Sequence, residues 1–310
     1  MTDIAVRKPP LLVVVGPTAV GKTALAVRLA GEFGGEIISA DSRQIYRHMD
    51  IGTAKPSREE MRSTPHHLIG AVDPDGVLTL AQYQAMAYGI IGRLHAQGKV
   101  PMLVGGTGLY VRAVVDGYRV PQVPPWPDLR KQLEQEAERD GPAALHARLA
   151  EVDPAAAVKI DFRNVRRVIR ALEVYEATGQ PMSTLQRKRP PPYRILQVGL
   201  TLPRDLLYRR IDQRVDRMME LGLEGEVRRL VEAGYSWGLP SMSALGYRQV
   251  GDYLRGQCTL EEAISQIKRD TRRFVHHQYT WFRLTDPRIH WFDAEPDPFS
   301  EVRAVVEQWA

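Results

Sequence analysis

The sequence has a single cysteine and no long apolar run. Cys258 is the one cysteine among 310 residues, which excludes an internal disulfide and a cysteine-based metal cluster. No stretch reaches the roughly 18 consecutive apolar residues of a transmembrane helix. The N-terminal MTDIAVRKPP lacks the basic and apolar regions of a signal peptide. These absences predict a cytoplasmic protein that does not associate with a membrane.

The charge balance is only mildly basic. Lysine and arginine number 42 against 37 acidic residues, and the sequence pI is about 9.3. Such an excess permits a polyanionic partner without requiring one. With 44% hydrophobic and 25% charged residues, the composition is that of a globular protein. The length suits one large domain or two small ones.

Short apolar runs alternate with helix-forming segments. Buried strands are predicted at LLVVV (11–15), EIISAD (36–41), KVPMLVGGTG (99–108) and RILQVGLTL (194–202). Helices are predicted at 21–30 and 79–97 between them. The alternation predicts an α/β fold with a parallel sheet, whose ligands lie at the carboxyl ends of the strands.

Two proline-rich segments interrupt this pattern. GYRVPQVPPWPD (117–128) and RKRPPPY (187–193) enclose a stretch that is helical in pattern throughout. The sequence therefore predicts an α/β core formed by 1–120 and 195–310, with an inserted all-helical subdomain at 121–194. Further core helices are expected at 204–234 and 261–284, where Thr259 and Glu262 form a capping box.

A phosphate-binding loop follows the first strand. It satisfies G-x-x-x-x-G-K-[ST] over Gly16, Pro17, Thr18, Ala19, Val20, Gly21, Lys22 and Thr23. The strand before it and the helix after it supply the required context. Backbone N–H groups at the helix N-terminus bind anions, Lys22 adds a positive charge, and Thr23 can bind Mg²⁺. The loop predicts phosphate binding at these residues.

Phosphoryl transfer has weaker support. A P-loop ATPase or GTPase also has a strand that ends in an aspartate, which holds the metal. The later strand VPMLV ends instead in Gly105-Gly106. An aspartate at a strand end does occur, Asp41, but its strand is the one directly after the loop in sequence. The motif alone does not tell which bond next to the phosphates is broken.

Several blocks of sequence together resemble one family. They are GPTAVGKT, SADSRQIYRHMDIGTAKP (39–56), HHLI (66–69), GGTGLY (105–110), RALEVYEATG (170–179), LGYRQ (245–249) and QYTWFR (278–283). This set resembles bacterial tRNA dimethylallyltransferases, also called tRNA isopentenyltransferases, over about residues 11–283. Gly70 departs from the pattern, because the family usually has an aspartate there.

The resemblance implies a fold and a reaction. The fold is P-loop NTPase-like, with a parallel sheet flanked by helices. The reaction transfers a dimethylallyl group from dimethylallyl diphosphate to the N6 amine of the adenine on the 3′ side of a tRNA anticodon, and the diphosphate leaves intact. The implied cofactor is Mg²⁺, the macromolecular partner is the tRNA anticodon stem-loop, and the chain is expected to be a monomer.

Three side chains receive catalytic roles by this resemblance. Asp41 is the general base that accepts the amine proton, Thr107 bonds the bridging oxygen, and Arg214 reaches the diphosphate or the reacting centre. On the residues alone, a general base and a rival role, either metal ligand or cap of the following turn, are equally supported for Asp41. The rival role for Thr107 is that of a turn residue. Arg214 belongs to a stripe with Arg210 and Arg217, whose interleaved Asp212 and Asp216 offer intrahelical pairing.

Contacts with tRNA are expected from several segments. The residues so predicted are Asp41, Ser42, Arg43, Gln44, Thr107, Arg166, Arg167, Arg170, Gly246, Tyr247, Arg248, Gln249, Arg272, Gln278, Trp281 and Arg283. In FRNVRRVIR, Arg163 and the three arginines after it share one helical face, which suits a phosphate backbone. The alternative pairs them with Asp153, Asp161 or Glu173. Basic and aromatic residues mixed in 268–283 suit unstacked RNA bases, or the aromatics are helix core.

Three other functions compete with tRNA prenylation. A P-loop kinase of small metabolites would share the loop, but it is weakened by Gly105-Gly106 and the arginine-rich helices. An enzyme that prenylates free adenine nucleotides would share the whole core. A non-catalytic RNA-binding P-loop protein would not need Lys22, Thr23, Asp41 and Thr107 together.

Overall fold

The computed structural model describes residues 8–310. The prediction that MTDIAVRKPP is not a signal peptide concerns residues that lie mostly outside this range. The described chain divides into two compact units. One contains the residues up to Val114 together with Pro192–Ala310, and the other is Val115–Pro191. The changeovers lie a few residues before the boundaries predicted at 121 and 194.

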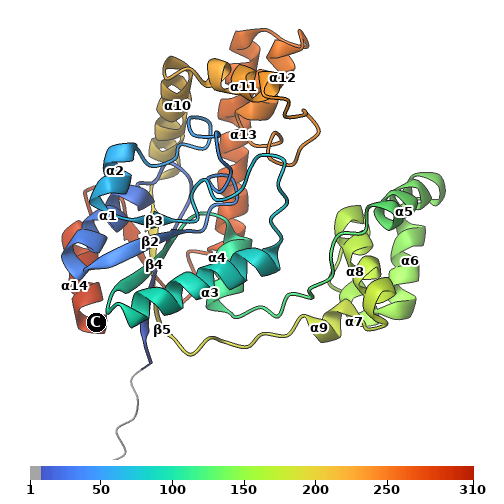
Figure 1. Ribbon diagram of the computed structural model, residues 1–310, viewed down its shortest axis with the longest axis horizontal. Coiled ribbons are helices and arrows are strands. Elements are labelled where there is room, and N and C mark those ends of the chain that lie inside the picture. The colour runs from blue at the N-terminus through green and yellow to red at the C-terminus, as the bar shows by residue number, and fades with distance from the viewer. Residues whose placement is uncertain (1–7) are drawn as a thin grey trace, which may run out of the picture. The chain divides into compact units, whose positions relative to one another are not determined.

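The first unit is built on a six-stranded sheet with the order β3-β2-β4-β1-β5-β6 (Figure 1). All neighbouring strands pair in parallel, which confirms the predicted parallel α/β sheet. The strands are β1 (Pro10–Val15), β2 (Gly35–Ser39), β3 (His66–His67), β4 (Val100–Val104), β5 (Arg194–Thr201) and β6 (Ile289–Asp293).

The central strand β1 is buried on both faces. Leu12 and Val14 belong to a core cluster with apolar side chains of α1 (Lys22–Phe33), α10 (Arg204–Glu220) and α14 (Phe299–Trp309). On the other face α3 (Leu80–Ala96) packs against β2 and β4. Burial on both sides explains why LLVVV is a continuous apolar run rather than an alternating one.

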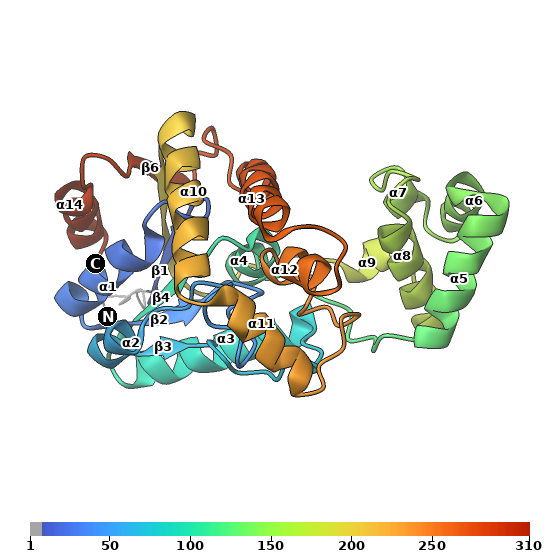
Figure 2. The same ribbon diagram turned by 90° about the horizontal axis from the view of Figure 1, so that it is seen from above.

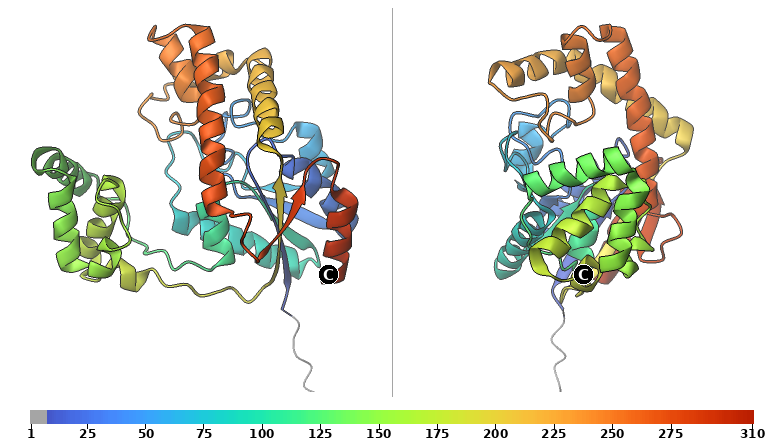
Figure 3. Two further views of the ribbon diagram at one scale, coloured as in Figure 1. Left: turned by 180° about the vertical axis from the view of Figure 1, so that it is seen from behind. Right: turned by 90° about the vertical axis from the view of Figure 1, so that its right-hand side faces the viewer.

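Four helices lie beyond the carboxyl edge of the sheet (Figures 1 and 3), and Figure 2 shows them from above. They are α10, α11 (Leu223–Glu232), α12 (Tyr247–Leu254) and α13 (Leu260–Trp281). The helical pattern predicted for 204–234 is divided between α10 and α11, because Gly222 adopts a φ of 91° and caps a new helix. The predicted capping box of Thr259 and Glu262 is confirmed at the start of α13.

Several short elements of the first unit were not predicted. They are β3, β6, α2 (Arg58–Ser63), α4 (Gly108–Val115), α12 and α14. β3 has two residues, and β6 alternates imperfectly at the sheet edge, so neither carries the periodicity that identifies a strand. β2 ends at Ser39 and β4 at Val104. Asp41 and Thr107 therefore lie in the turns just beyond the strands.

The second unit is helical, as its sequence pattern predicts. It contains α5 (Pro127–Asp140), α6 (Pro142–Val152), α7 (Pro154–Ala157), α8 (Val165–Thr178) and α9 (Met182–Leu185). Leu133, Leu145, Leu149 and Leu172 form the centre of its own apolar core. Among all helices that the structure describes, none combines the length and apolarity needed to cross a bilayer.

Candidate active site

The phosphate loop joins β1 to α1 at the carboxyl edge of the sheet. A Cβ on Gly16 would lie 2.5 Å from the backbone oxygen of Leu200, so only glycine fits beside β5. Gly21 has a φ of 101° and occupies the N-cap position of α1 without any capping side chain. The first N–H groups of α1 are therefore not satisfied by a side-chain cap, as a bound anion requires.

Lys22 is the charged member of the loop. Its Nζ donates a hydrogen bond to the backbone oxygen of Pro17 at 2.7 Å. Burial lowers the pKa of Lys22 to about 8, Asp41 opposes this shift, and Arg214 adds to it. A buried ammonium with a lowered pKa gains from an anion placed beside it. The three side chains come from α1, the turn after β2 and α10.

Gln278 ties the phosphate loop to the GGTG turn. Its Oε1 accepts from the backbone N–H of Thr18 at 2.8 Å, and its Nε2 donates to the backbone oxygen of Gly106 at 3.2 Å. Gln278 is 4% exposed. Direct contact of this side chain with tRNA, as predicted, does not fit that placement. Its position instead fixes the loop against the turn.

Thr107 connects the ends of β4 and β2. Its backbone N–H donates to the oxygen of Ala40 at 3.1 Å. Its Oγ1 accepts from the backbone N–H of Ser42 at 3.0 Å and lies 3.3 Å from the Ser42 hydroxyl. A Cβ on Gly105 would lie 2.2 Å from the Ala40 oxygen. The second glycine-rich turn therefore packs directly against the segment that carries Asp41.

Asp41 caps the turn that follows it. Its Oδ1 accepts backbone N–H bonds from Arg43 at 2.8 Å and Gln44 at 3.3 Å. For Oδ2, no hydrogen bond is found within residues 8–310. The capping alternative thus accounts for one carboxylate oxygen and leaves the other available to a ligand.

Arg214 enters the site from α10. Burial lowers its pKa, and the Asp41 carboxylate opposes that shift. Its Nη2 donates to the backbone oxygen of Thr53 at 3.5 Å. The alternative that Asp212 and Asp216 pair with this stripe does not hold, because these two acids pair across to Arg272 and Lys268 of α13. Within the stripe, Arg217 pairs with Glu220 of the same helix and Arg210 pairs with Glu295. Arg214 is left without a carboxylate partner in the described chain.

Several residues predicted to bind tRNA have internal roles. Tyr247 is 0% and Gln249 1% exposed. The Tyr247 hydroxyl donates to Glu226, and Gln249 Nε2 donates to Asp270 at 2.8 Å. Their burial contradicts direct tRNA contact. Arg248, whose Nη2 also binds Asp270 at 2.8 Å, keeps 54% of its side chain exposed.

The turn after Asp41 carries further predicted tRNA contacts. Arg43 Nη1 donates to the backbone oxygen of Pro240 at 2.7 Å. Gln44 Nε2 donates to the backbone oxygen of Ala54 at 3.1 Å. Both side chains therefore brace this turn, and Gly246 shapes the start of α12 with a φ of 91°.

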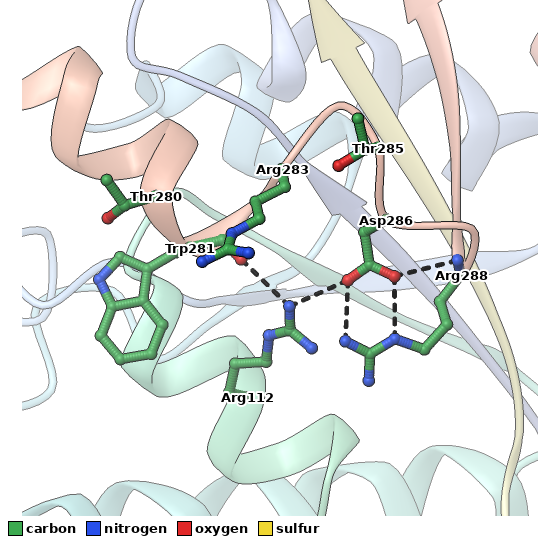
Figure 4. Close-up of a pocket in the computed structure, with 7 residues that line it drawn as sticks. All are labelled: Arg112, Thr280, Trp281, Arg283, Thr285, Asp286 and Arg288. Atoms are coloured by element: carbon green, nitrogen blue, oxygen red, sulfur yellow. Dashed lines mark hydrogen bonds and ion pairs between the residues drawn. The ribbon is translucent and has the colours of Figure 1, made fainter. Parts of the chain in front are cut away.

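A cavity of about 410 Å³ lies at the end of α13 (Figure 4). Arg112 Nη2 donates to the Trp281 backbone oxygen and to Asp286, both at 3.1 Å, and Asp286 also pairs with Arg288. The Trp281 side chain packs over Gly108, where a Cβ would lie 2.2 Å from its ring. Arg283 is exposed at the rim, and no side-chain partner for it is found in the described chain.

The arginines of the helical unit separate into two groups. Arg163 lies before α8 and pairs with Asp161, while Arg170 pairs with the buried Glu173. The prediction of four arginines on one helical face is therefore wrong for Arg163, and the acid-pairing alternative holds for it and for Arg170. Arg166 and Arg167 are exposed, and neither has an acidic partner among residues 8–310.

Two acids of the site region were not predicted. Glu226 binds the Tyr247 hydroxyl, and Asp270 binds Arg248 and Gln249. The available signal was an acid on the apolar face of an amphipathic helix. Glu226 lies three residues after Leu223 and four before Leu230, both buried. An acid at such a position must bind an internal donor, because burying a free charge is costly.

The Thr23 hydroxyl is the candidate protein ligand for a magnesium ion at the loop. No group of three or more histidine, cysteine or acidic side chains that could hold a metal occurs within the described residues. Mg²⁺ commonly keeps several waters and takes one or two protein oxygens plus substrate phosphates. The Thr23 hydroxyl next to the phosphate loop fits that mode of binding.

Comparison with known proteins identifies the family. The family model described as IPP transferase matches residues 44–285. The tRNA dimethylallyltransferase of Roseiflexus castenholzii is 56% identical over 300 residues, covering 96% of this chain and 98% of the relative. That of Thermomicrobium roseum is 52% identical, covering 97% and 92%.

Solved structures of similar proteins point to the same family. The tRNA isopentenylpyrophosphate transferase of Bacillus halodurans is 43% identical, with a TM-score of 0.73 and coverage of 97% of both chains. A eukaryotic dimethylallyltransferase acting on tRNA is 27% identical, with a TM-score of 0.81 and coverage of 96% of this chain and 78% of that one. With its parallel sheet, phosphate loop and near full-length matches, the chain belongs to the IPP transferase family.

Proposed function

We propose that this protein transfers a dimethylallyl group from dimethylallyl diphosphate to tRNA. The acceptor is the N6 amine of the adenine on the 3′ side of the anticodon, and diphosphate is released. The observation that carries the proposal is that Gln278 and Thr107 join the phosphate loop, the GGTG turn and the segment of Asp41 at one edge of the sheet. The effects of Asp41 and Arg214 on the pKa of Lys22 agree with this arrangement. The names of the relatives support the same activity.

The chemistry follows from where the charges lie. The C–O bond between the allylic carbon and the diphosphate breaks, and its electron pair leaves with the diphosphate. The new C–N bond forms from the adenine amine, whose proton passes to Oδ2 of Asp41. Lys22, Arg214 and the loop N–H groups meet the growing negative charge on the diphosphate, so they act mainly in the transition state.

Mg²⁺ belongs to the proposal as a cofactor. The Thr23 hydroxyl would hold it together with diphosphate oxygens. When bound, the ion supplies positive charge that neutralises the leaving diphosphate. Lys22 and the N–H groups of the loop provide the remaining neutralisation from the protein.

A kinase fits the donor set less well. β4 ends at Val104 and continues into Gly105-Gly106, so it lacks the terminal aspartate that holds the metal in P-loop phosphoryl transfer. Prenylation of free adenine nucleotides is separated from tRNA prenylation by the acceptor alone. The exposed Arg166 and Arg167 favour the polyanionic acceptor.

The helical unit is proposed to bind the anticodon stem-loop through Arg166 and Arg167. Both are exposed, and no acid pairs with them within the described part of the chain. Arg170 has a different role, since it holds Glu173 and the backbone oxygen of Val123. We also propose that the protein is a monomer in the cytoplasm.

Replacing Arg166 and Arg167 together with glutamine is expected to weaken tRNA binding and to flatten its salt dependence. Each lost phosphate contact should reduce the slope of log K against log[salt] by about 0.7 to 0.9. Filter binding of unmodified tRNA across a salt series measures this slope. A control variant, Lys131→Gln with Arg139→Gln, removes two exposed charges from α5. Equal slopes for both variants would exclude Arg166 and Arg167 from the tRNA interface.

The affinity for diphosphate is expected to fall as pH rises through about 8. Below that value Lys22 is protonated and attracts the anion, and above it the free protein loses that charge, because burial lowers the pKa of Lys22 to about 8. Calorimetric titration with inorganic diphosphate at a series of pH values measures the change. The Lys22→Met variant corrects for titration of the diphosphate itself. A parallel pH dependence in both proteins would contradict the prediction.

Mass spectrometry of unmodified tRNA tests the activity itself. After incubation with dimethylallyl diphosphate and Mg²⁺, one anticodon-loop adenosine should carry the mass of an isopentenyl group. Parallel reactions contain free AMP as acceptor, or labelled ATP with small-metabolite acceptors. Prenylated AMP without prenylated tRNA would shift the proposal to the nucleotide substrate, and label transferred from ATP would point to a kinase.

A further inference from the structure

A buried carboxylate on α11 binds the backbone of the loop Asp50–Gly52, which follows the turn at Asp41 in the sequence. Glu226 is 4% exposed. Its Oε2 accepts from the backbone N–H groups of Asp50 and Ile51, both at 2.9 Å. Its Oε1 accepts from the N–H groups of Ile51 and Gly52, both at 3.1 Å. We call this carboxylate, with the three N–H groups and the Tyr247 hydroxyl, the Glu226 clamp.

The tyrosine of the clamp is fixed by packing. Tyr247 is 0% exposed, and its hydroxyl donates to Oε1 of Glu226. Burial and the Glu226 carboxylate raise the pKa of Tyr247, so the hydroxyl remains a donor. A Cβ on Gly52 would lie 2.4 Å from the Tyr247 ring and 2.8 Å from Leu223. The backbone of residue 52 can lie this close to Tyr247 and Leu223 only because the residue is glycine.

The clamped loop leads directly to the side chain of Arg214. Thr53 follows Gly52 and is 7% exposed, and its Oγ1 donates to the backbone oxygen of Met49 at 2.6 Å. The backbone oxygen of Thr53 accepts the Arg214 bond at 3.5 Å. No other hydrogen bond or ion pair of the Arg214 guanidinium occurs in the described residues. Its orientation within the site therefore depends on where the Thr53 oxygen lies.

Asp41 is less dependent on the same loop. Its Oδ1 is held by the backbone N–H groups of Arg43 and Gln44. The Gln44 side chain reaches Ala54 at 3.1 Å as well as Thr53 at 3.4 Å. A shift of Thr53 therefore removes the one bond of Arg214, whereas the turn at Asp41 keeps its own bonds.

We propose that Glu226 is a positioning residue of the transfer reaction, which acts through the Asp50–Thr53 loop to orient Arg214 toward the leaving diphosphate. The inference rests on the proposed function. In Glu226→Gln the amide NH₂ faces backbone donors and cannot accept their bonds, so the loop and the Thr53 oxygen move. Displacement of a catalytic group by about 1 Å can lower a rate by about 100-fold.

A double-mutant cycle separates positioning from general stabilisation. Glu226→Gln is expected to lower kcat by about 10- to 100-fold in the wild-type background, with the KM for tRNA unchanged. In the Arg214→Ala background the same change should lower kcat by less than about 2-fold, because the group it orients is gone. Single-turnover prenylation of tRNA measures all four proteins. Equal losses in both backgrounds, or full activity of Glu226→Gln, would overturn the inference.

Two further variants serve as controls for the double-mutant cycle. Glu224→Gln removes another carboxylate from the first turn of α11, which pairs with Arg228 at 2.8 Å, and it should retain wild-type kcat. If Glu226→Gln does not fold, Tyr247→Phe keeps the ring and removes the hydroxyl. That variant should lower kcat by about 3- to 10-fold only when Arg214 is present, and wild-type activity would overturn the inference. Failure of the proposed function can be told from failure of this inference, because wild-type protein would then prenylate no tRNA.

Discussion

Asp41→Asn is expected to lower kcat by about 100- to 10,000-fold, the usual contribution of a general base. Asparagine keeps an oxygen at the Oδ1 position, which accepts from the backbone N–H groups of Arg43 and Gln44. It replaces the available Oδ2 with an amide that cannot accept a proton. The substitution therefore removes the base and preserves the turn. Affinity for tRNA is expected to change little, because the phosphate contacts are proposed on another unit of the chain.

Single-turnover prenylation and tRNA filter binding together test this result. Asp75→Asn, an exposed carboxylate with no hydrogen bond or ion pair in the described structure, is the matched control and should be fully active. Asp41→Ala should lose stability as well as activity, because the turn loses its cap, worth about 1 kcal/mol. Near-normal turnover of Asp41→Asn would leave Asp41 with the capping role alone.

Lys22→Met is expected to lower kcat/KM for dimethylallyl diphosphate by about 100- to 1,000-fold, as for the loss of one preorganised donor to a developing anion. The Lys22 side chain is half-buried at the start of α1, and its Nζ donates to the backbone oxygen of Pro17. Methionine fills a similar volume without charge, so the loop is expected to keep its conformation. The loss should fall on the step in which the diphosphate leaves.

Initial rates at varied dimethylallyl diphosphate measure this effect, with thermal unfolding as the check on folding. Lys8→Met is the control, since Lys8 is exposed just before β1, at the opposite end of that strand from the loop. The control should match the wild type. A Lys22→Met protein with unchanged kcat/KM would show that the loop does not serve the leaving group.

The local features of the site could be predicted because they depend on short spacings. Gly16, Gly21 and Lys22 form a phosphate loop wherever a strand precedes and a helix follows, and both do here. The buried runs of β1, β4 and β5 identify a parallel sheet. Asp41 and Thr107 could be placed near the loop because both follow strands of that sheet.

The roles of the longer-range residues could not be predicted in this way. Tyr247, Gln249 and Gln278 are polar residues in blocks that carry the family resemblance, yet each is buried and binds a partner far along the chain. Arg272 was expected to face RNA, and it pairs with Asp212 of a different helix. A spacing rule tells which face a residue occupies, but not which helix covers that face.

The sequence by itself determined the parallel sheet, the phosphate loop and the family resemblance, because each depends on contiguous residues and on strand and helix periods. Only the tertiary structure decided which side chains are free to act. Among the described residues, Oδ2 of Asp41 accepts no hydrogen bond, and Arg166 and Arg167 are exposed without an acidic partner. Glu226, by contrast, is buried against the loop that leads to Thr53. The physical reason is that burial and hydrogen-bond partners depend on elements that meet across the fold, such as α10 with α13 and α11 with α12.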